Sequence, residues 1–558
     1  IDGEMVYPGR SDIYVMQAGG GATSAVIIDP SGRNLIGSQA AHRGDQWNAE
    51  SQIITDQTAL SGNQVKLNWV ESPNSANNGE QNNGLYIYNH LDFVDQSKEW
   101  MYNENQQTLY LHTANNVLSK DIRAPQYAYG IEVLGDHYEI SDINIKYYWK
   151  DGIFINGEYV RVQYNTITHN YNAAVFMDGN TDHAQVLHNK INDISGVGVH
   201  AFFTSFGEFM YNDIRNISDK AWGRSTGKHD QPFVANNQFS TGISGMSTES
   251  NIARGNYLEN IGYVGIRFDG RNHLIEQNII VHAMQMLGDG GAIYSYQAPN
   301  SAFPTHKNLV QYNIIEMNSN PNNQVGYKMN VNAKNLTANV YFDNATHDNV
   351  LQNNVFDGCS LFCVLLNRNN NDHVIRKNIA YSDNKLLQVT NEPRPSPNGN
   401  NDNNASSFNI VSDDHIIEDN LFVSLDHNVE AVYTRNYTPD ANYRPGSFSG
   451  NTYLSPYSNM IAEDRRNAVL GDNTNLIISP FNYNGWINYI NESGASFPKT
   501  GWTYTNKATA KADLNLVSNK SLFTQTFVVP VNHNLVDGTP TAGSIMIPGM
   551  SAKVTVKQ

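Results

Sequence analysis

The sequence has few cysteines, few charged residues and no long hydrophobic run. Its 558 residues include two cysteines, Cys359 and Cys363, which cannot build a disulfide framework and lack the second ligand pair of a structural zinc site. We therefore expect two thiols packed in the core. No run of about 18 apolar residues occurs, so no membrane-spanning helix is predicted. Hydrophobic residues still make up 40% of the chain, enough for a large core.

Basic residues are scarce relative to acidic ones. The chain carries 36 Lys and Arg against 53 Asp and Glu, a formal net charge of −17. Duplex nucleic acids and anionic membranes are bound through basic surfaces, so we expect neither as a partner. The net negative charge of the chain favours a neutral substrate over an anionic one. The sequence makes no prediction about the oligomeric state.

A short repeat fills the middle of the chain. An apolar-x-x-Asn-x-apolar pattern recurs at Val162–Ile167, Val186–Ile191, Val234–Phe239 and Ile275–Ile280, with a period of about 20–25 residues. Variants of it continue along the chain at Asn212, Asn256, Asn313, Asn353, Asn378, Asn420 and Asn451. The segments between these asparagines are short, β-branched and aromatic, and glycine or asparagine turns bound them, which predicts strands rather than helices.

Short strands at a fixed period predict an all-β solenoid, and a parallel β-helix also explains the asparagines. We expect each Asn to take the left-handed conformation at a corner of the coil and to hydrogen-bond to its neighbours along the axis. Residues 1–130 lack the repeat and are predicted to form a β-rich N-terminal cap or sandwich. The β-helix is expected over 131–455, and a small β-module over 456–558 would close its end.

A column of aromatic and polar residues is predicted along one face of the β-helix. Strand alternation points the middle residue of each aligned triplet outward, next to its equivalent about 4.8 Å away in the following coil. Such a ladder of rings and donors suits the faces and hydroxyls of sugar rings. In the alternative interpretation, an insertion covers this face and the aromatics belong to the core. The column comprises Phe154, Phe176, His200, Arg267, Tyr294, Tyr341 and Leu365. One position past each triplet, a second, polar column comprises Asn156, Asp178, Asp269, Tyr296, Asp343 and Asn367.

One acidic residue stands out beside this column. In the segment Leu287–Tyr294, glycines flank Asp289 and would let backbone and ligand approach it closely. Glycosidic bonds are cleaved by two carboxyl groups, one acting as an acid and one as a nucleophile or base. The preferred partner is Asp343, because its strand follows that of Asp289 in the repeat. Other candidates for the second carboxylate are Asp269, Glu316 and Glu249.

The segments around these acids resemble a known group of enzymes. Asp289–Tyr294 and the following Val340–Asp343 are similar to the Asp-x-Gly-x-Ile-Tyr and Ile-Tyr-Leu-Asp-Asp segments of right-handed parallel β-helix glycoside hydrolases, namely families 120 and 141 and, more distantly, 110. Glu99–Tyr102, Gln107–His112 and Ile545–Val554 are similar to other segments of that group. The resemblance implies a right-handed β-helix, hydrolysis of glycosidic bonds, and Asp289 and Asp343 as the catalytic pair. Asn344 departs from the pattern, in which a second Asp follows.

The leading hypothesis is a secreted or periplasmic glycoside hydrolase acting on a plant or algal polysaccharide or oligosaccharide, with anionic and sulfated glycans among the expected substrates. An alternative is a polysaccharide lyase or epimerase on the same fold, using Lys228, His229 and Asp230 with Arg267. A third is a non-catalytic glycan-binding adhesin. No cofactor is expected, and no compact cluster of metal ligands stands out. Predicted substrate-binding residues are Phe176, His200, Arg224, Lys228, His229, Glu249, Arg267, Tyr294 and Tyr341.

Overall fold

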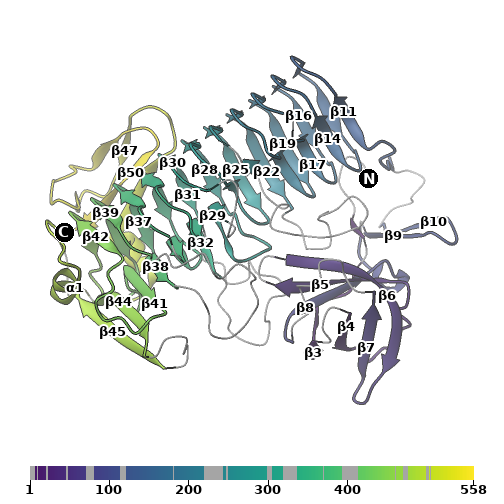
Figure 1. Cartoon of the computed structure of the whole chain (residues 1–558), viewed down its shortest axis with the longest axis horizontal. Helices are drawn as coiled ribbons and strands as arrows, with labels where there is room; N and C mark the ends of the chain where they lie inside the picture. The colour runs from purple at the N-terminus through teal and green to yellow at the C-terminus, as the bar shows by residue number, and fades with distance from the viewer. Residues whose placement is uncertain are drawn as a thin grey trace.

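The chain forms a long β-helix with a smaller β-domain at each end of the sequence (Figure 1), as seen in a computed structural model. Among the described residues no helix is long and apolar enough to cross a bilayer. The described residues are 7–8, 10–19, 23–45, 48–70, 81–97, 99–113, 121–179, 181–218, 243–246, 249–297, 304–317, 336–368, 370–392, 412–458, 460–468, 475–497, 502 and 504–558.

The N-terminal region is a β-domain, as its alternating strand-like runs predict. Its described strands form one seven-stranded sheet in the order β2 (Tyr14–Val15), β8 (Gly84–Tyr88), β5 (Gln39–Asp45), β6 (Asn48–Ala59), β7 (Gln64–Trp69), β4 (Ser24–Ile28) and β3 (Ala18–Gly19). A 3₁₀ turn, Leu91–Phe93, follows, and a smaller sheet contains β1 (Tyr7–Pro8), β9 (Glu99–Asn103) and β10 (Thr108–Leu111). Ala41, Tyr86 and Tyr88 belong to the same buried hydrophobic cluster as the interior of the β-helix, so the two regions pack together.

The β-helix is built from three parallel sheets, and each coil adds one strand to each of them (Figure 1). We call them sheets 1, 2 and 3 in the order in which the chain visits them. Among the described residues, sheet 1 has 13 strands, of which β45 alone pairs antiparallel. They are β11 (Tyr129–Val133), β14 (Asp151–Ile155), β17 (Ala173–Met177), β20 (Val197–Ala201), β23 (Ile243–Met246), β26 (Ile266–Phe268), β29 (Gly290–Tyr296), β32 (Thr337–Asp343), β35 (Phe362–Asn367), β38 (Lys385–Asn391), β41 (Val432–Asn436), β44 (Met460–Asn467) and β45 (Leu476–Asn482).

Sheets 2 and 3 have shorter strands, 11 each in the described part. Sheet 2 contains β12 (Glu139–Ser141), β15 (Arg161–Gln163), β18 (Gln185–Leu187), β21 (Glu208–Met210), β24 (Ile252–Arg254), β27 (Leu274–Glu276), β30 (Leu309–Gln311), β33 (Val350–Gln352), β36 (Val374–Arg376), β39 (His415–Glu418) and β42 (Gly446–Ser449). Sheet 3 contains β13 (Asn144–Lys146), β16 (Thr166–Thr168), β19 (Lys190–Ile194), β22 (Asp213–Ile217), β25 (Tyr257–Ile261), β28 (Ile279–Val281), β31 (Ile314–Glu316), β34 (Val355–Asp357), β37 (Ile379–Ser382), β40 (Leu421–Ser424) and β43 (Thr452–Leu454).

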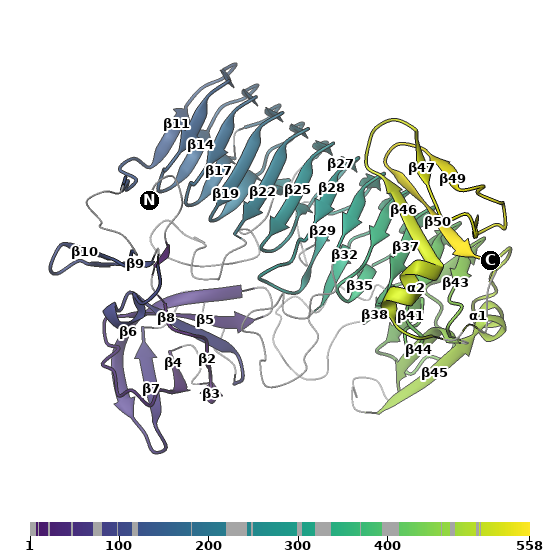
Figure 2. The same ribbon diagram turned by 180° about the vertical axis from the view of Figure 1, so that it is seen from behind.

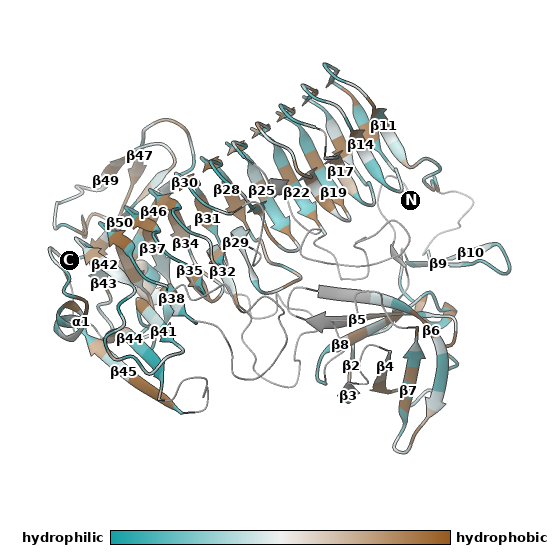
Figure 3. Cartoon of the chain, viewed as in Figure 1, coloured by the Kyte–Doolittle hydropathy of each residue, from teal (hydrophilic) through white to brown (hydrophobic). Residues whose placement is uncertain are grey.

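The core lies inside the coil, where one apolar column from each sheet meets the other two. In sheet 1, for example, Ile153, Val175 and Val199 stack in register and are fully buried. The strands therefore alternate between hydrophobic and hydrophilic residues (Figure 3). Stacking places each inward side chain on its equivalent in the next coil, so the repeat itself produces a continuous core.

A ladder of buried asparagines runs along the corner between sheets 2 and 3. The Oδ1 of Asn189 accepts hydrogen bonds from the backbone N–H of Asn165 (3.0 Å) and from the Nδ2 of Asn165 (3.1 Å). The Nδ2 of Asn189 donates to the carbonyl of Val162 (2.9 Å) and to Oδ1 of Asn212 (3.1 Å). The pattern continues to Asn451, whose amide and backbone N–H donate to Glu492 Oε1. The predicted axial ladder is confirmed, and every rung satisfies polar groups that burial would otherwise penalise.

Two details of the predicted ladder are wrong. The left-handed residue is the one before each ladder Asn, such as Tyr164 (φ 56°) and His188 (φ 55°), because the ladder Asn needs its side chain directed into the coil. The rung near residue 353 is Asn354, whereas Asn353 is the left-handed corner. The predicted repeat position Asn237 lies outside the described residues. In sheet 3, β22 pairs directly with β25.

A second buried ladder marks the corner between sheets 1 and 2, and here histidines replace some of the asparagines. Nδ1 of His273 accepts from the backbone N–H of Asn251 (3.1 Å), and Nδ1 of His415 accepts from that of His373 (3.3 Å). Asn308 and Asn349 fill the same position in other coils through Oδ1. An Nδ1 that accepts carries no proton, so these rings must be neutral, and burial lowers the pKa of His273 to about 4 and that of His415 to about 3.

The C-terminal residues cover the far end and one side of the β-helix (Figure 2). The antiparallel pair β44–β45 ends sheet 1 and leads into helix α1 (Tyr483–Ile490). Helix α2 (Lys507–Asp513) precedes a small β-module, whose residues Leu514 and Val554 share a buried cluster with Tyr381 of sheet 3. Its strands are β46 (Leu514–Asn519), β47 (Gln525–Val528), β48 (His533–Leu535), β49 (Ser544–Ile547) and β50 (Ser551–Lys557).

The two cysteines form a disulfide, so the expectation of two thiols is wrong. Cys359 and Cys363 are both fully buried, and their Cα atoms lie 5.1 Å apart, within reach of an S–S bond. Cys363 is in β35, and the bond closes the tight turn that leads into this strand.

Candidate functional site

Three neighbouring strands of sheet 1 carry the candidate site. Their registers place Tyr294 of β29 beside Tyr341 of β32, and Tyr296 beside Asp343. Asp343 in turn lies beside Asn367 of β35. Because side chains two residues apart share a face of a strand, Tyr341 and Asp343 project on the same outer face of the sheet. The predicted alignment of these columns is confirmed.

The column is much less exposed than predicted. Phe154 and Phe176 are half-buried, but His200, Arg267, Tyr294, Tyr341 and Leu365 are all buried. The rings close over one another: Tyr294 and Tyr341 meet edge to face with centroids 5.2 Å apart. In backbone register, Ser244 lies beside His200, at a position that carries no aromatic signal in the sequence.

Asp343 is the more enclosed of the two acids. Its Oδ1 accepts from Nδ2 of Asn367 (2.8 Å), and its Oδ2 accepts from Oη of Tyr294 (2.9 Å). The residue keeps 7% of its exposed area, so it is enclosed without being sealed from water. Burial raises the pKa of Asp343, and the donors on Asn367 and Tyr294 offset part of that rise. A carboxyl group in this environment holds its proton to a higher pH than a solvated Asp.

Asp289 directly precedes β29 and is more exposed than Asp343. It adopts a left-handed conformation (φ 54°) before Gly290, and its carbonyl accepts from Oη of Tyr263 (2.6 Å). A Cβ at Gly290 would lie 2.9 Å from the Tyr263 ring, which explains why a glycine follows the acid. Oδ1 of Asp289 accepts a hydrogen bond from Oη of Tyr341 (3.1 Å).

The two carboxylates are joined through one hydroxyl and one amide. Oη of Tyr341 donates to Asp289 and accepts from Nδ2 of Asn367 (2.9 Å), which also donates to Asp343. The path limits the distance between Oδ1 of Asp289 and Oδ1 of Asp343 to at most about 9 Å, which does not exceed the upper end of the separations of glycosidase carboxyl pairs. Burial and the negative charges of Asp289 and Asp343 raise the pKa of Tyr341, so its hydroxyl stays protonated between them.

Arg267 and Asp269 form an ion pair beside this group. Nη2 of Arg267 lies 3.1 Å from Oδ2 of Asp269, and the guanidinium is 5.6 Å from the centre of the Tyr294 ring. Oδ1 of Asp269 accepts from the backbone N–H of Tyr296 (2.8 Å). Asp269 is thus occupied as a structural partner of Arg267 and of β29, and the positive charge of Arg267 is matched.

The structure does not bring the other candidate acids to this group. Glu316 is on sheet 3 and pairs with Lys520 (2.6 Å) of the C-terminal module. Glu249 is at the corner between sheets 1 and 2, paired with Arg271 (2.8 Å).

The remaining predicted binding residues divide into two sets. Phe176 and His200 stack on each other (4.8 Å) in the preceding coils of sheet 1, where burial, helped by Arg267, lowers the pKa of His200 to about 4. Arg224, Lys228 and His229, with Asp230, lie outside the described residues.

Two residues of the site were not predicted. Asn367 was placed in the polar column but given no role, although its position one coil after Asp343 was the available signal. Tyr263, whose hydroxyl holds the backbone of Asp289, follows no motif and lies in the turn before β26. Its contact depends on how the segment from β28 to β29 folds back, which the repeat does not specify.

Comparisons with known proteins agree with this fold. The family model described as "right handed beta helix region" matches residues 74–239 and 129–325. From β11 onward, the described strands of this part of the chain form a right-handed parallel β-helix, and the resemblance to β-helix glycoside hydrolases is confirmed at the level of fold. No curated protein matches the sequence.

Several solved structures are similar to the chain. They include a glycoside hydrolase with 10% identity over 69% of this chain and 74% of the other (TM-score 0.45). A tailspike protein of the E. coli bacteriophage HK620, in complex with a hexasaccharide, has 8% identity over 76% and 75% (TM-score 0.35). An alginate lyase from a Paenibacillus species has 14% identity over 56% and 75% (TM-score 0.22).

Proposed function

We propose that the protein is a glycoside hydrolase in which Asp343 and Asp289 form the catalytic carboxyl pair. The observation that carries this proposal is the linked arrangement of the two acids through Tyr341 and Asn367 on one face of sheet 1. Two carboxyl groups with unequal environments at such a separation are what acid-catalysed glycosidic cleavage requires.

The environments assign different roles to the two acids. Asp343 is the proton donor, because burial raises its pKa and keeps it protonated where a solvated Asp is ionised. Asp289 is the partner that attacks the sugar or activates water, because it is more exposed than Asp343 and its Oδ1 accepts a hydrogen bond from Oη of Tyr341. Tyr341 is a positioning residue that orients Asp289 and lies between the two carboxyl groups.

The described groups suit a hydrolase better than a lyase. A lyase needs a base that removes a carbon-bound proton and a cation that neutralises the adjacent carboxylate. Burial raises the pKa of both Tyr294 and Tyr341, which keeps their hydroxyls protonated so that neither is available as the base, and Asp269 already matches the charge of Arg267. A lyase or epimerase and a non-catalytic glycan-binding adhesin remain the alternatives to be tested.

The substrate we propose is a polysaccharide or oligosaccharide of plant or algal origin. The buried disulfide Cys359–Cys363 suits a secreted or periplasmic protein, since disulfides persist in oxidising compartments. The ion-paired state of Arg267 gives no reason to restrict the substrate to anionic sugars. The panel to test should therefore contain neutral, uronate-containing and sulfated glycans.

The experiment measures release of reducing ends and ultraviolet absorbance from each glycan with the wild type, Asp289→Asn and Asp343→Asn. Each variant should lose about 10²–10⁴-fold in rate, as expected for loss of a general acid or its partner. Asp178→Asn is the matched control, because Asp178 follows strand β17 of the same sheet and accepts from its neighbour Gly179. It should keep wild-type activity.

The other outcomes separate the alternatives. Products that absorb in the ultraviolet contain a new double bond and would show a lyase. Tight binding without cleavage, unaffected by either Asn substitution, would show an adhesin. Unchanged cleavage in both variants would exclude these two acids from the reaction.

A further inference from the structure

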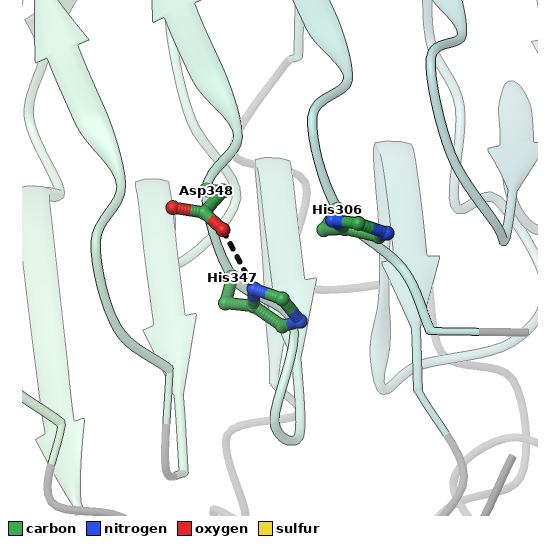
Figure 4. A group of neighbouring side chains, drawn as sticks. All are labelled: His306, His347 and Asp348. Carbon is green, nitrogen blue, oxygen red and sulfur yellow. Dashed lines mark hydrogen bonds and ion pairs between the residues drawn. The ribbon is translucent and has the colours of Figure 1, made fainter.

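A histidine pair and a carboxylate meet at the corner between sheets 1 and 2 (Figure 4). His306 and His347 occupy the same corner position in successive coils and pair through an isolated β-bridge. Their ring centroids are 4.9 Å apart, with 25° between the ring planes. Nδ1 of His347 lies 3.0 Å from Oδ2 of Asp348. Among the described residues, this is the group of three whose ligand atoms all lie within 4.8 Å of one another.

We propose that His306, His347 and Asp348 bind a divalent transition-metal ion of the zinc type. Two imidazole nitrogens and one carboxylate oxygen form the donor set that such ions prefer, and calcium and magnesium favour oxygen alone. The ligand atoms of a tetrahedral zinc ion lie about 3.4 Å apart, so ligand atoms that lie within 4.8 Å of one another have to approach by at most about 1.4 Å. A side-chain rotation supplies a movement of this size without displacing the coil.

The state of His306 supports this site independently. Its Nδ1 is buried and has no hydrogen-bond partner, a condition that costs free energy unless a ligand satisfies it. The nearby Arg271 is already paired with Glu249 at 2.8 Å.

The charges around the corner also favour a cation. The pKa of Asp372, in the next coil, is raised by burial and then by the negative charges of Asp348 and Asp414. The carboxylates of Asp348, Asp372 and Asp414 repel one another along this corner of the coil, and a divalent ion bound at Asp348 would reduce that repulsion.

The consequence is a clamp between two coils. His347 follows β32 after a short turn, and His306 follows β29 in the preceding coil. The ion would therefore tie together the two strands that carry Tyr294 and Asp343. The prediction does not depend on the proposed function, because metal binding is measured without a substrate.

The test is calorimetric titration of the chelator-treated full-length chain with zinc chloride, followed by thermal unfolding with and without zinc. We expect saturable binding at one site and a higher unfolding temperature with zinc. His306→Ala and Asp348→Asn should each weaken binding at least tenfold, since even indirect partners of metal ligands contribute about 10–100-fold. Asp348 is largely exposed, so its substitution leaves the fold intact.

His183→Ala is the control, because His183 is a stacked corner histidine between Tyr159 and Phe206, outside this group. It should bind zinc as the wild type does. The proposal is overturned if the wild type gives no saturable binding, or if His306→Ala and Asp348→Asn both bind zinc as tightly as the wild type.

Discussion

Acidification should destabilise this protein through the histidines of its corner ladder. His273, His373 and His415 are buried, and the Nδ1 of each accepts a backbone N–H of the preceding coil. Protonation would turn that acceptor into a donor and place a positive charge inside the coil. The folded protein therefore resists protonation, whereas the unfolded chain takes up protons from about pH 6.5 downward.

The magnitude follows from the depressed pKa values. The folded pKa is about 4 for His273 and about 3 for His415. One pKa unit corresponds to about 1.36 kcal/mol. The free energy of unfolding at pH 4 is therefore about 3 kcal/mol lower, for each of these rings, than it is above pH 6.5. The loss begins as the pH falls through the unfolded pKa and ends near the folded pKa. Two such rings remove a large part of the 5–15 kcal/mol typical of a folded domain.

The assay compares the free energy of unfolding at pH 7 and pH 4, from urea denaturation followed by tryptophan fluorescence. His415→Asn is the informative variant, because Asn308 and Asn349 fill the same ladder position with an acceptor that does not titrate. Its loss between the two pH values should be about 3 kcal/mol smaller than that of the wild type. His112→Asn, at an exposed residue, should follow the wild type. Equal losses in the wild type and His415→Asn would refute the reasoning.

Three further predictions concern other buried polar groups. Asn278→Ala leaves two donors of the preceding coil without an acceptor and should cost about 4 kcal/mol in urea denaturation, against less than about 0.5 kcal/mol for the exposed Asn428→Ala. Burial raises the pKa of Asp151 to about 7, so the free energy of unfolding falls as the pH rises from 4 to 8. Asp151→Asn should reduce that fall by up to about 4 kcal/mol, and an unchanged fall would contradict this prediction. Tyr294→Phe removes a donor that lowers the pKa of Asp343, so the alkaline limb of the pH–rate profile should move to higher pH; a shift to lower pH would be inconsistent with Asp343 as the acid.

The sequence by itself determined the solenoid and the alignment of its columns. Each residue of a parallel β-helix contacts its equivalent one coil away, so a periodic sequence already contains most of the contacts of the fold. The asparagine ladder was visible for this reason, as was the juxtaposition of Tyr294 with Tyr341 and of Tyr296 with Asp343.

The tertiary structure decided which of these residues are buried and what they touch. The repeat does not specify how the segment before β29 folds back, and that path places Tyr263 and Asp289 together. It does not specify side-chain rotation, and rotation brings the Tyr341 hydroxyl between Asp289 and Asn367. Periodicity fixes positions along the axis of the coil, but hydrogen bonds across the face depend on the direction of each side chain and on the loops between coils.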